Sequence, residues 1–373
     1  MTTAKETVGV LFETANIRVG GSRPWDIQVH NEKFYSRLIA DRSLGLGESY
    51  MEEWWDCQAP DQFIERIVQT KAHQVPTFSE LLLGIQAKFF NLQNMQRSRK
   101  VIEEHYDLSN ELYFSFLDPY NQYTCGYFKN TENLAEAQQF KLNLICRKLK
   151  LTAQDTLLDI GCGWGGLAKF AAEQYGCAVA GLTTSREQAR YARDFVKGLP
   201  VEIIEADYRE WSKSGKKYTK IATVGMIEHV GHKNYQTFFN EVSSLLSPSG
   251  LFLLHTIGGH VSQTHGDIWS HKYIFPNGMV PSLAQIGLAS EGLFILEDMQ
   301  NFGPYYDKTL MAWEENFRKN WPSIQSAYSE KFYRMWRYYF LSFAGSFRAR
   351  RLDLWQLVFS KEWDSRGIYQ AER

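Results

Sequence analysis

Short apolar segments alternate with amphipathic stretches from about residue 155 onward, and this alternation is the main structural signal in the chain. Such a pattern is typical of a parallel sheet that has helices on its faces. The predicted strands are TLLDIG (156–161), AVAGLT (178–183), VEIIEAD (201–207), KIATVGMI (220–227), LFLLHTI (251–257), FILEDM (294–299) and LWQLVFS (354–360). The predicted helices are 166–176, which Gly176 can end, 186–199, which Ser185 can cap, and 235–246.

The chain before residue 155 is organised differently. Residues 1 to about 95 mix short apolar segments with glycine-rich turns and end in a helical pattern over 79–100. Residues 101–150 are expected to form helices that DPYNQYTCGYF (118–128) interrupts. We therefore expect a smaller, mainly helical N-terminal domain over 1–95 and an α/β catalytic domain over 96–373.

Charge and cysteine content exclude several classes of protein. The 41 Lys+Arg and 42 Asp+Glu leave a net charge of −1, which argues against binding to nucleic acid. The 5 cysteines lack a C-x-x-C pair, so neither a zinc ribbon nor a disulfide scaffold is expected, and no metal site is expected. No signal peptide or apolar run of about 20 residues is evident. The sequence thus predicts a cytoplasmic protein that is soluble or lies on a membrane.

A glycine-rich loop follows the first predicted strand. In residues 159–166, DIGCGWGG, the spacing of Gly161, Gly163 and Gly166 fits a nucleotide-binding loop, although glycines can also serve only a tight turn. A nicotinamide-dependent enzyme usually has an acidic residue at the end of the second strand. Here residues 181–185 read GLTTS, so a nicotinamide dehydrogenase is disfavoured.

Titratable side chains follow two further strands. Glu228 and His229 come after the fourth strand, and His255 lies near the end of the fifth. The carboxyl ends of parallel strands share one edge of a sheet, which is also the edge of the glycine loop. The position favours catalysis, but a structural role for each residue is an equally good interpretation.

The motifs together resemble a known family. LLDIGCGWGGLA resembles the S-adenosylmethionine loop of methyltransferases, and the whole chain is similar to the cyclopropane-fatty-acyl-phospholipid synthases. The matching segments are SLGLGESYMEEWWD (43–56), HYDLSNELYFSFLDPYNQYTCGYF (105–128), VGMIEHVGHKNY (224–235), LFLLHTIG (251–258), KYIFPNG (272–278), NFGPYYDKTLMAW (301–313) and FRAR (347–350). The resemblance implies a Rossmann-like methyltransferase fold with a central, mostly parallel seven-stranded sheet.

The resemblance also implies a cofactor site for S-adenosylmethionine. The backbone near Gly161 and Gly163 would hold the methionine part, and Asp207 could accept a hydrogen bond from the adenine amino group. The complete set of implied cofactor residues is Tyr123, Thr124, Asp159, Gly161, Gly163, Thr183, Thr184, Gln188 and Asp207.

In the resembling family, the sulfonium methyl is transferred to a cis alkene of a phospholipid acyl chain, and bound bicarbonate removes a proton so that a cyclopropane ring closes. The positions implied to hold bicarbonate are Cys125, Glu228, His255, the backbone of Ile257, and Tyr306. Glu228 would accept the bicarbonate proton, and His255 and Tyr306 would donate. Cys125 would not be a nucleophile. Family members often have a cysteine at the position of Phe343, so its absence here argues against an essential thiol there.

The implied substrate requires contact with a membrane. Helix 79–100, which ends in the basic residues Arg97, Arg99 and Lys100, is expected to lie at the bilayer surface or, equally, to pack between domains or across a dimer. The resemblance implies a homodimer that is cytoplasmic and associates peripherally with the inner face of the membrane. A related methyltransferase that leaves a methyl branch, without a ring, is the alternative. A lipid or nucleoside sensor without activity is disfavoured, because the implied site residues are all present.

Overall fold

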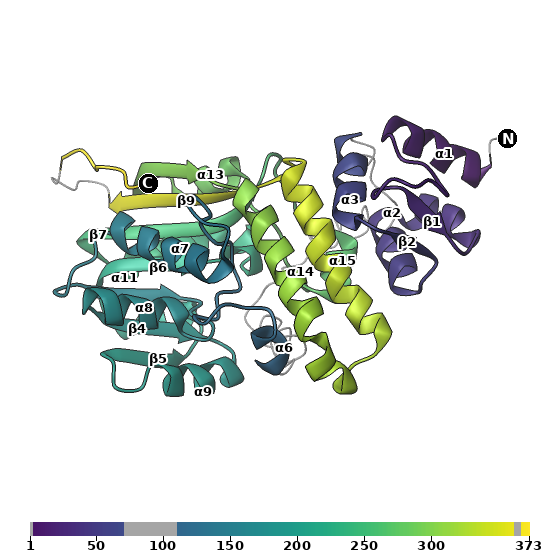
Figure 1. Ribbon diagram of the computed structural model, residues 1–373. Helices are drawn as coiled ribbons and strands as arrows, with labels where there is room; N and C mark the ends of the chain where they lie inside the picture. Colours follow the sequence, from purple (N-terminus) through teal and green to yellow (C-terminus); the bar gives the residue numbers. More distant parts are fainter. Residues whose placement is uncertain (1–2, 71–109, 362–366) are drawn as a thin grey trace. The chain divides into compact units, whose positions relative to one another are not determined.

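The computed structural model describes residues 3–70, 110–361 and 367–373, and the chain divides into two compact units (Figure 1). The described part of one, the helical unit, comprises 3–70, 264–278 and 306–352. The other, the sheet unit, comprises 110–263, 279–305 and 353–373. Neither unit is one continuous stretch of sequence. The predicted domain boundary at residue 95, and helix 79–100 with its basic end, lie outside the described residues.

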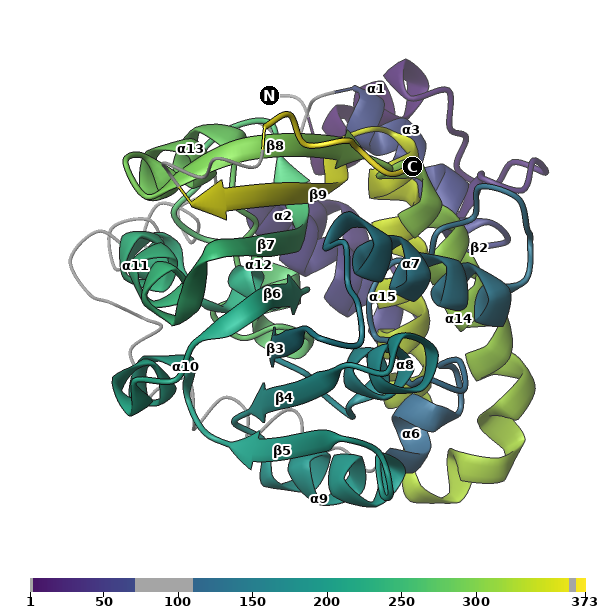
Figure 2. The same cartoon turned by 90° about the vertical axis from the view of Figure 1, so that its left-hand side faces the viewer.

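The sheet unit is built on a seven-stranded sheet in the order β5-β4-β3-β6-β7-β9-β8 (Figure 2). The strands are β3 (Thr156–Ile160), β4 (Ala178–Thr183), β5 (Val201–Glu205), β6 (Tyr218–Val224), β7 (Leu246–Gly259), β8 (Phe294–Asn301) and β9 (Leu352–Lys361). Strands β5, β4, β3, β6 and β7 pair in parallel, whereas β8 pairs antiparallel with β9. The predicted seven-stranded, mostly parallel sheet is confirmed.

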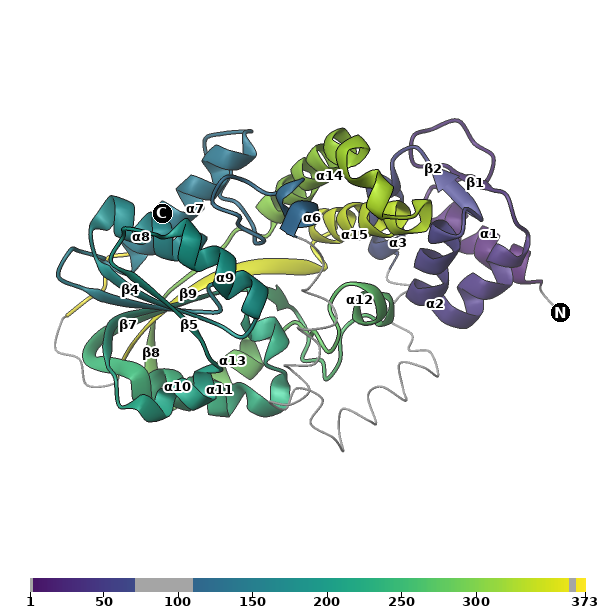
Figure 3. The same ribbon diagram turned by 90° about the horizontal axis from the view of Figure 1, so that it is seen from below.

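Helices cover both faces of this sheet. They are α6 (Asn110–Phe114), α7 (Leu134–Lys148), α8 (Gly166–Tyr175), α9 (Arg186–Phe195), α10 (Tyr208–Trp211), α11 (Tyr235–Leu245) and α13 (Leu283–Ser290), with short 3-10 helices η2 (Ser212–Ser214), η3 (Ile227–His229) and η4 (His232–Asn234). Figure 3 shows α7, α8 and α9 on one face and α10, α11 and α13 on the other. Side chains alternate accordingly: Leu157 packs with α7 and α8, and Leu158 packs with α11. Both faces are therefore apolar, as a covered parallel sheet requires.

Local signals set most of the element ends. The Ser185 side chain accepts a hydrogen bond from the Gln188 N–H at 3.3 Å, so Ser185 caps α9 as predicted. Gly176 ends α8 with a left-handed φ of 68°. The start of the fifth predicted strand at residue 251 was wrong, because β7 begins at Leu246. Tyr218 pairs with Leu246, and a register shift between Tyr218 and Lys220 accommodates the Pro-Ser-Gly segment.

The helical unit contains two short strands and several helices. These are α1 (Ala4–Thr14), β1 (Ile27–Val29), α2 (Lys33–Met51), β2 (Trp55–Cys57), α3 (Pro60–Gln69), α12 (Ile268–Tyr273), α14 (Pro304–Ile324), η5 (Gln325–Ala327) and α15 (Glu330–Arg348). Strands β1 and β2 pair antiparallel. None of the helices within the described residues has the length and apolar character needed to cross a bilayer.

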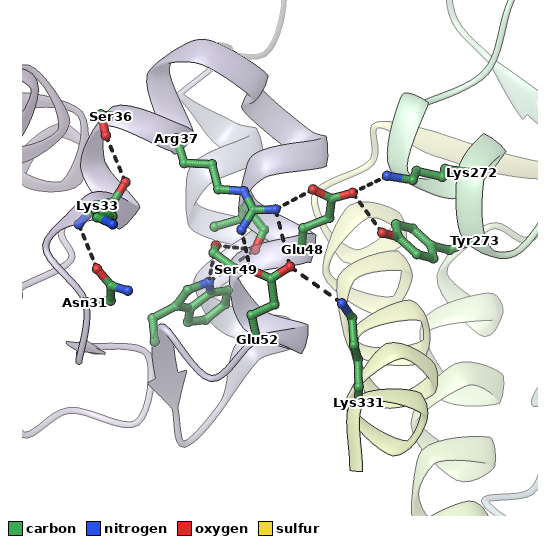
Figure 4. Close-up of polar contacts among 12 residues, drawn as sticks. Asn31, Lys33, Ser36, Arg37, Glu48, Ser49, Glu52, Lys272, Tyr273 and Lys331 are labelled. Carbon is green, nitrogen blue, oxygen red and sulfur yellow. Dashed lines mark hydrogen bonds and ion pairs between the residues drawn. The ribbon is translucent and has the colours of Figure 1, made fainter. Parts of the chain in front are cut away.

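A buried carboxylate ties the separate segments of the helical unit together. Glu48, on α2, accepts hydrogen bonds from Lys272 Nζ at 2.6 Å and from the Tyr273 hydroxyl at 2.8 Å, both on α12 (Figure 4). Arg37 bridges Glu48 and Glu52. Burial alone would raise the pKa of Glu48, but these donors outweigh burial and lower it. The ionised carboxylate therefore fixes residues 264–278 onto the N-terminal helices.

Arg348 makes a second such link at the end of α15. Its guanidinium donates to Asp61 on α3 at 2.6 Å and to both carboxylate oxygens of Asp307 on α14. The FRAR sequence thus holds three helices of this unit together by charge-assisted hydrogen bonds. Phe343, in the turn before it, packs edge-on against Tyr339.

Candidate active site

The glycine loop joins β3 to α8 at the carboxyl edge of the sheet. Gly161 has a φ of +84°, and a Cβ there would lie 2.8 Å from the Met226 side chain, so only glycine fits. Its N–H and that of Cys162 donate to the Leu182 carbonyl at 2.9 and 2.8 Å, which fixes the loop to β4. At Gly163 no described heavy atom lies within 4 Å of an added Cβ. The loop therefore leaves open space where a ligand can approach the backbone.

Asp159 is buried directly before this loop. Burial raises the pKa of its carboxyl to about 7, and the nearby Lys141 ammonium opposes the shift. Its Oδ2 atom has no hydrogen-bond partner among the described residues. A buried acceptor without a partner needs a donor from a ligand or water. This atom and the open loop fit a cofactor that carries an ammonium group, as S-adenosylmethionine does.

The predicted ribose and adenine positions follow β4 and β5. Thr183 Oγ1 and Gln188 Oε1 lie 3.1 Å apart, and Thr184 beside them is half-buried. Asp207 caps α10 and accepts hydrogen bonds from Arg209 at 2.6 and 2.8 Å. The structure thus brings Thr183 and Gln188 together. The Asp207 carboxylate is already held by arginine, so its contact with adenine stays a prediction.

Residues 118–125 form a loop that reaches the end of β6. A Cβ added at Gly225 would lie 2.6 Å from Thr124 Cγ2, so the Tyr123–Thr124 segment packs directly on this strand end. Gln138 supports the loop from α7, donating to the Thr124 carbonyl at 2.7 Å. Cys125 is fully buried in the same loop, and its thiol donates to the Gly126 carbonyl at 3.2 Å.

Lys141 is the main support of this loop, and the sequence analysis missed it. Its ammonium is fully buried and donates to Thr124 Oγ1 at 2.9 Å and to the Gln122 side chain. Burial lowers the pKa of Lys141 to about 8, and the charge of Asp118 opposes this shift. A charged residue on the apolar face of a helix, between Ala137 and Ile145, is the signal that could have identified it.

Glu228 lies in η3, immediately after β6. Its Oε1 accepts a hydrogen bond from the Ile257 N–H at 2.8 Å, and this contact joins the ends of β6 and β7. Burial raises the pKa of Glu228 to about 7, although the N–H bond partly opposes the shift. Its Oε2 has no hydrogen-bond partner among the described residues. The neighbouring His229 is half-buried, and loss of solvent around its ring lowers its pKa to about 4.

His255 lies on β7, where its carbonyl accepts the Gly225 N–H at 2.9 Å. Its Nδ1 is 3.2 Å from the Gln356 side-chain nitrogen on β9. Its Nε2 has no hydrogen-bond partner within the described part of the chain. Burial lowers the pKa of His255 well below its ordinary value, so the ring is neutral at pH 7.

Aromatic side chains gather beside this histidine. The Phe302 ring meets His255 nearly edge-on at 5.7 Å and Tyr127 at 5.5 Å. Tyr305 extends the group, with its ring 5.6 Å from Tyr127 and 6.3 Å from Phe128. The sheet unit therefore provides an apolar, aromatic wall next to a neutral imidazole.

Tyr306, the remaining predicted anion ligand, belongs to the helical unit. Its ring stacks on Phe347 at 4.6 Å and meets Trp313 edge-on at 6.0 Å. Its participation in the same site as Glu228 and His255 stays a prediction.

The contacts of Lys141 lead to a test of the loop. We expect Lys141→Met to raise the KM for S-adenosylmethionine by about tenfold and to change kcat much less, since each hydrogen bond to a charged group contributes roughly 1.5–3 kcal/mol. Steady-state kinetics with the cofactor varied measures both constants.

Lys148→Met is the matched control for this variant. Lys148 is on the same helix and equally buried, but it pairs with Asp298 on β8 at 3.4 Å. We expect it to lower the free energy of unfolding and to leave the cofactor KM unchanged. Equal KM values for all three proteins would contradict the supporting role of Lys141.

Comparisons with known proteins agree on one family. The model of the mycolic acid cyclopropane synthetase family matches residues 93–357. A cyclopropane-fatty-acyl-phospholipid synthase from Escherichia coli strain K12 is 48% identical over 353 residues, which cover 94% of this chain and 92% of that protein. A probable fatty acid methyltransferase from Pseudomonas putida is 37% identical over 277 residues, covering 71% of this chain and 70% of its own.

A solved structure gives the same result. The mycolic acid cyclopropane synthase CmaA1, complexed with SAH and CTAB, is 31% identical, with a TM-score of 0.65 over 70% of this chain and 98% of its own. The family-model match over residues 93–357 includes the glycine loop and both strand ends that carry Glu228 and His255. The chain belongs to the cyclopropane synthase family of S-adenosylmethionine-dependent methyltransferases.

Proposed function

We propose that the protein transfers a methylene group from S-adenosylmethionine to the cis double bond of an unsaturated acyl chain in a membrane phospholipid, forming a cyclopropane ring. The observation that carries this proposal is the pair of buried strand-end residues, Glu228 and His255, beside the glycine loop. Each has a polar atom without a hydrogen-bond partner among the described residues. The close relation to the Escherichia coli enzyme supports the choice of substrate.

The proposed reaction requires orientation and the exclusion of water. S-adenosylmethionine supplies an electrophilic methyl group, but an alkene is a poor nucleophile, so the reacting carbons must be held close and in line. Gly161 and the loop supported by Lys141 would hold the cofactor. The transfer leaves positive charge on the acyl chain, which water would trap. The rings of Phe302 and Tyr127 can stabilise such a cation through cation–π attraction while excluding water.

We further propose that a bound bicarbonate supplies the base that removes a proton from the new methyl group. A small oxyanion can act inside an apolar pocket where a side chain does not reach the methyl group, and the protein holds it by hydrogen bonds. His255 would donate a hydrogen bond to it, and Glu228 would accept the proton of its hydroxyl group. Tyr306 and Cys125 would complete the site, and Ile257 would act through the carboxylate that its N–H holds.

The substrate also determines where the protein works. A phospholipid alkene lies among acyl chains, so the enzyme must reach a bilayer surface. We propose peripheral association with the cytoplasmic face of the membrane, homodimer formation, and a lipid-engaging role for residues 1–95. A second group of basic residues comprises Lys213, Lys216, Lys217 and Lys220. Two of them have ion-pair partners within the protein, because Lys216 pairs with Glu202 and Lys220 pairs with Asp155. We therefore propose segment 79–100 as the contact with lipid.

The product distinguishes ring formation from methyl branching. With a trideuterated methyl group on the cofactor and vesicles of unsaturated phospholipid, ring closure must remove one deuteron from the new methyl. We expect acyl chains that gain one carbon with two deuterium atoms, measured by mass spectrometry of the released fatty acids. Retention of all three would show a methyl-branched product and contradict the proposal.

Removal of bicarbonate tests the proposed base. We expect wild-type turnover to fall in buffer depleted of carbon dioxide and to return on addition of bicarbonate, but not of chloride. Glu228→Gln, which keeps the acceptor for the Ile257 N–H, should lose roughly 100-fold or more in turnover and bind S-adenosylmethionine within about twofold of wild type. Unchanged wild-type activity after depletion would exclude bicarbonate.

Glu202→Gln is a control for the Glu228 variant. Its carboxylate is exposed on β5 and pairs with Lys216 at 3.7 Å. It should retain wild-type turnover and the same response to bicarbonate. A Glu228→Gln protein that has lost cofactor binding would show that this carboxylate belongs to the cofactor site instead.

A further inference from the structure

Gln356 on β9 is a polar partner of the His255 ring. The two side chains are each 0% exposed, and the Gln356 amide nitrogen lies 3.2 Å from His255 Nδ1. Strands β7 and β9 are neighbours in the sheet, so both side chains are held by regular backbone. Phe302 contacts the same imidazole at 5.7 Å. The ring therefore has a fixed polar contact on Nδ1 and an aromatic contact on one side.

The chemistry of the contact determines where the ring proton lies. Burial lowers the pKa of His255, and the nearby charges of Lys141 and Lys148 lower it further. A neutral imidazole carries one proton, on either Nδ1 or Nε2. With the amide nitrogen facing the ring, the NH₂ group donates, Nδ1 accepts and the proton is on Nε2. Nε2 has no hydrogen-bond partner among the described residues, so this N–H is available to a ligand.

Burial of the Gln356 side chain at this position also costs free energy of folding. Its Oε1 has no hydrogen-bond partner within the described part of the chain, although the side chain is fully buried. An apolar side chain would avoid this cost, as Leu357 and Val358 do in the same strand. A buried amide that leaves one of its own groups unsatisfied points to a role other than packing.

We propose that Gln356 is a positioning residue that holds His255 in the tautomer with its proton on Nε2. The inference rests on the proposed function, in which His255 donates a hydrogen bond to the oxyanion base. A glutamate at position 356 would accept a hydrogen bond from an Nδ1–H group, so Nε2 would carry no proton and its lone pair would repel an anion. A methionine would remove the hydrogen bond by which the amide favours the Nε2–H tautomer.

The ¹⁵N NMR spectrum of the histidine ring tests this directly, because it separates protonated from unprotonated ring nitrogens. In protein labelled with ¹⁵N-histidine, the His255 signals are those that disappear in His255→Asn. We expect a protonated Nε2 in the wild type at pH 7, and a protonated Nδ1 in Gln356→Glu. We also expect Gln356→Glu to lower kcat by roughly 100-fold and to leave cofactor affinity within about twofold of wild type.

Two further variants make the result decisive. Gln356→Met should lower kcat less than Gln356→Glu does, and it should show both tautomers. Ser360→Ala is the control on the same strand, because Ser360 is buried but bonds Glu297 at 2.6 Å. It should keep the wild-type ring spectrum and kcat.

A wild-type ring with its proton on Nδ1 would overturn the proposal, and this spectrum needs no variant to fold. A Gln356→Met protein with a single Nε2–H tautomer and normal kcat would also overturn it. The spectra are recorded without lipid or bicarbonate, so they report the tautomer of His255 independently of the proposed bicarbonate base. If the tautomer is as expected but bicarbonate depletion has no effect, the proposed function fails and the role of Gln356 remains.

Discussion

One hydrogen bond, from the Ile257 N–H to Glu228, organises the reactive edge of the sheet. It joins the ends of β6 and β7 and points a buried carboxylate along the same edge as the glycine loop. Because one carboxylate oxygen is bound by backbone, the orientation of the other is set by the fold. The sheet thus determines the position of Glu228, and His255 on β7 is placed relative to it by the same pair of strands.

Burial of ionisable groups gives this edge its chemical character. Burial raises the pKa of Asp159 and of Glu228 to about 7, and it lowers the pKa of Lys141 to about 8. For both carboxyls the folded protein binds the proton more tightly than the unfolded chain does, so the stability they contribute is present in acid and is lost as the pH rises toward about 7. Near neutral pH the carboxylates at this edge of the sheet are partly ionised, and each has an oxygen without a hydrogen-bond partner among the described residues. A ligand that supplies hydrogen-bond donors to these carboxylates therefore stabilises the folded protein when it binds there.

The sequence predicted the parts of the fold that local pattern controls. The strand set, the Ser185 cap and the end of α8 at Gly176 follow from residues next to one another. The start of β7 could not be predicted, because Pro248 is typical of a turn. Only pairing with Tyr218 keeps Leu246 in the strand.

The strand-end side chains were likewise predictable, but their supports were not. Lys141 acts on Thr124, 17 residues away, and Gln356 contacts His255, 101 residues away. The most direct measurement of the whole site is electron density beside His255 in crystals grown with bicarbonate. We expect a planar, three-oxygen density within hydrogen-bond distance of Glu228 Oε2 and His255 Nε2. Density showing these two atoms bonded to each other, or to water alone, would contradict an anion site at this edge of the sheet.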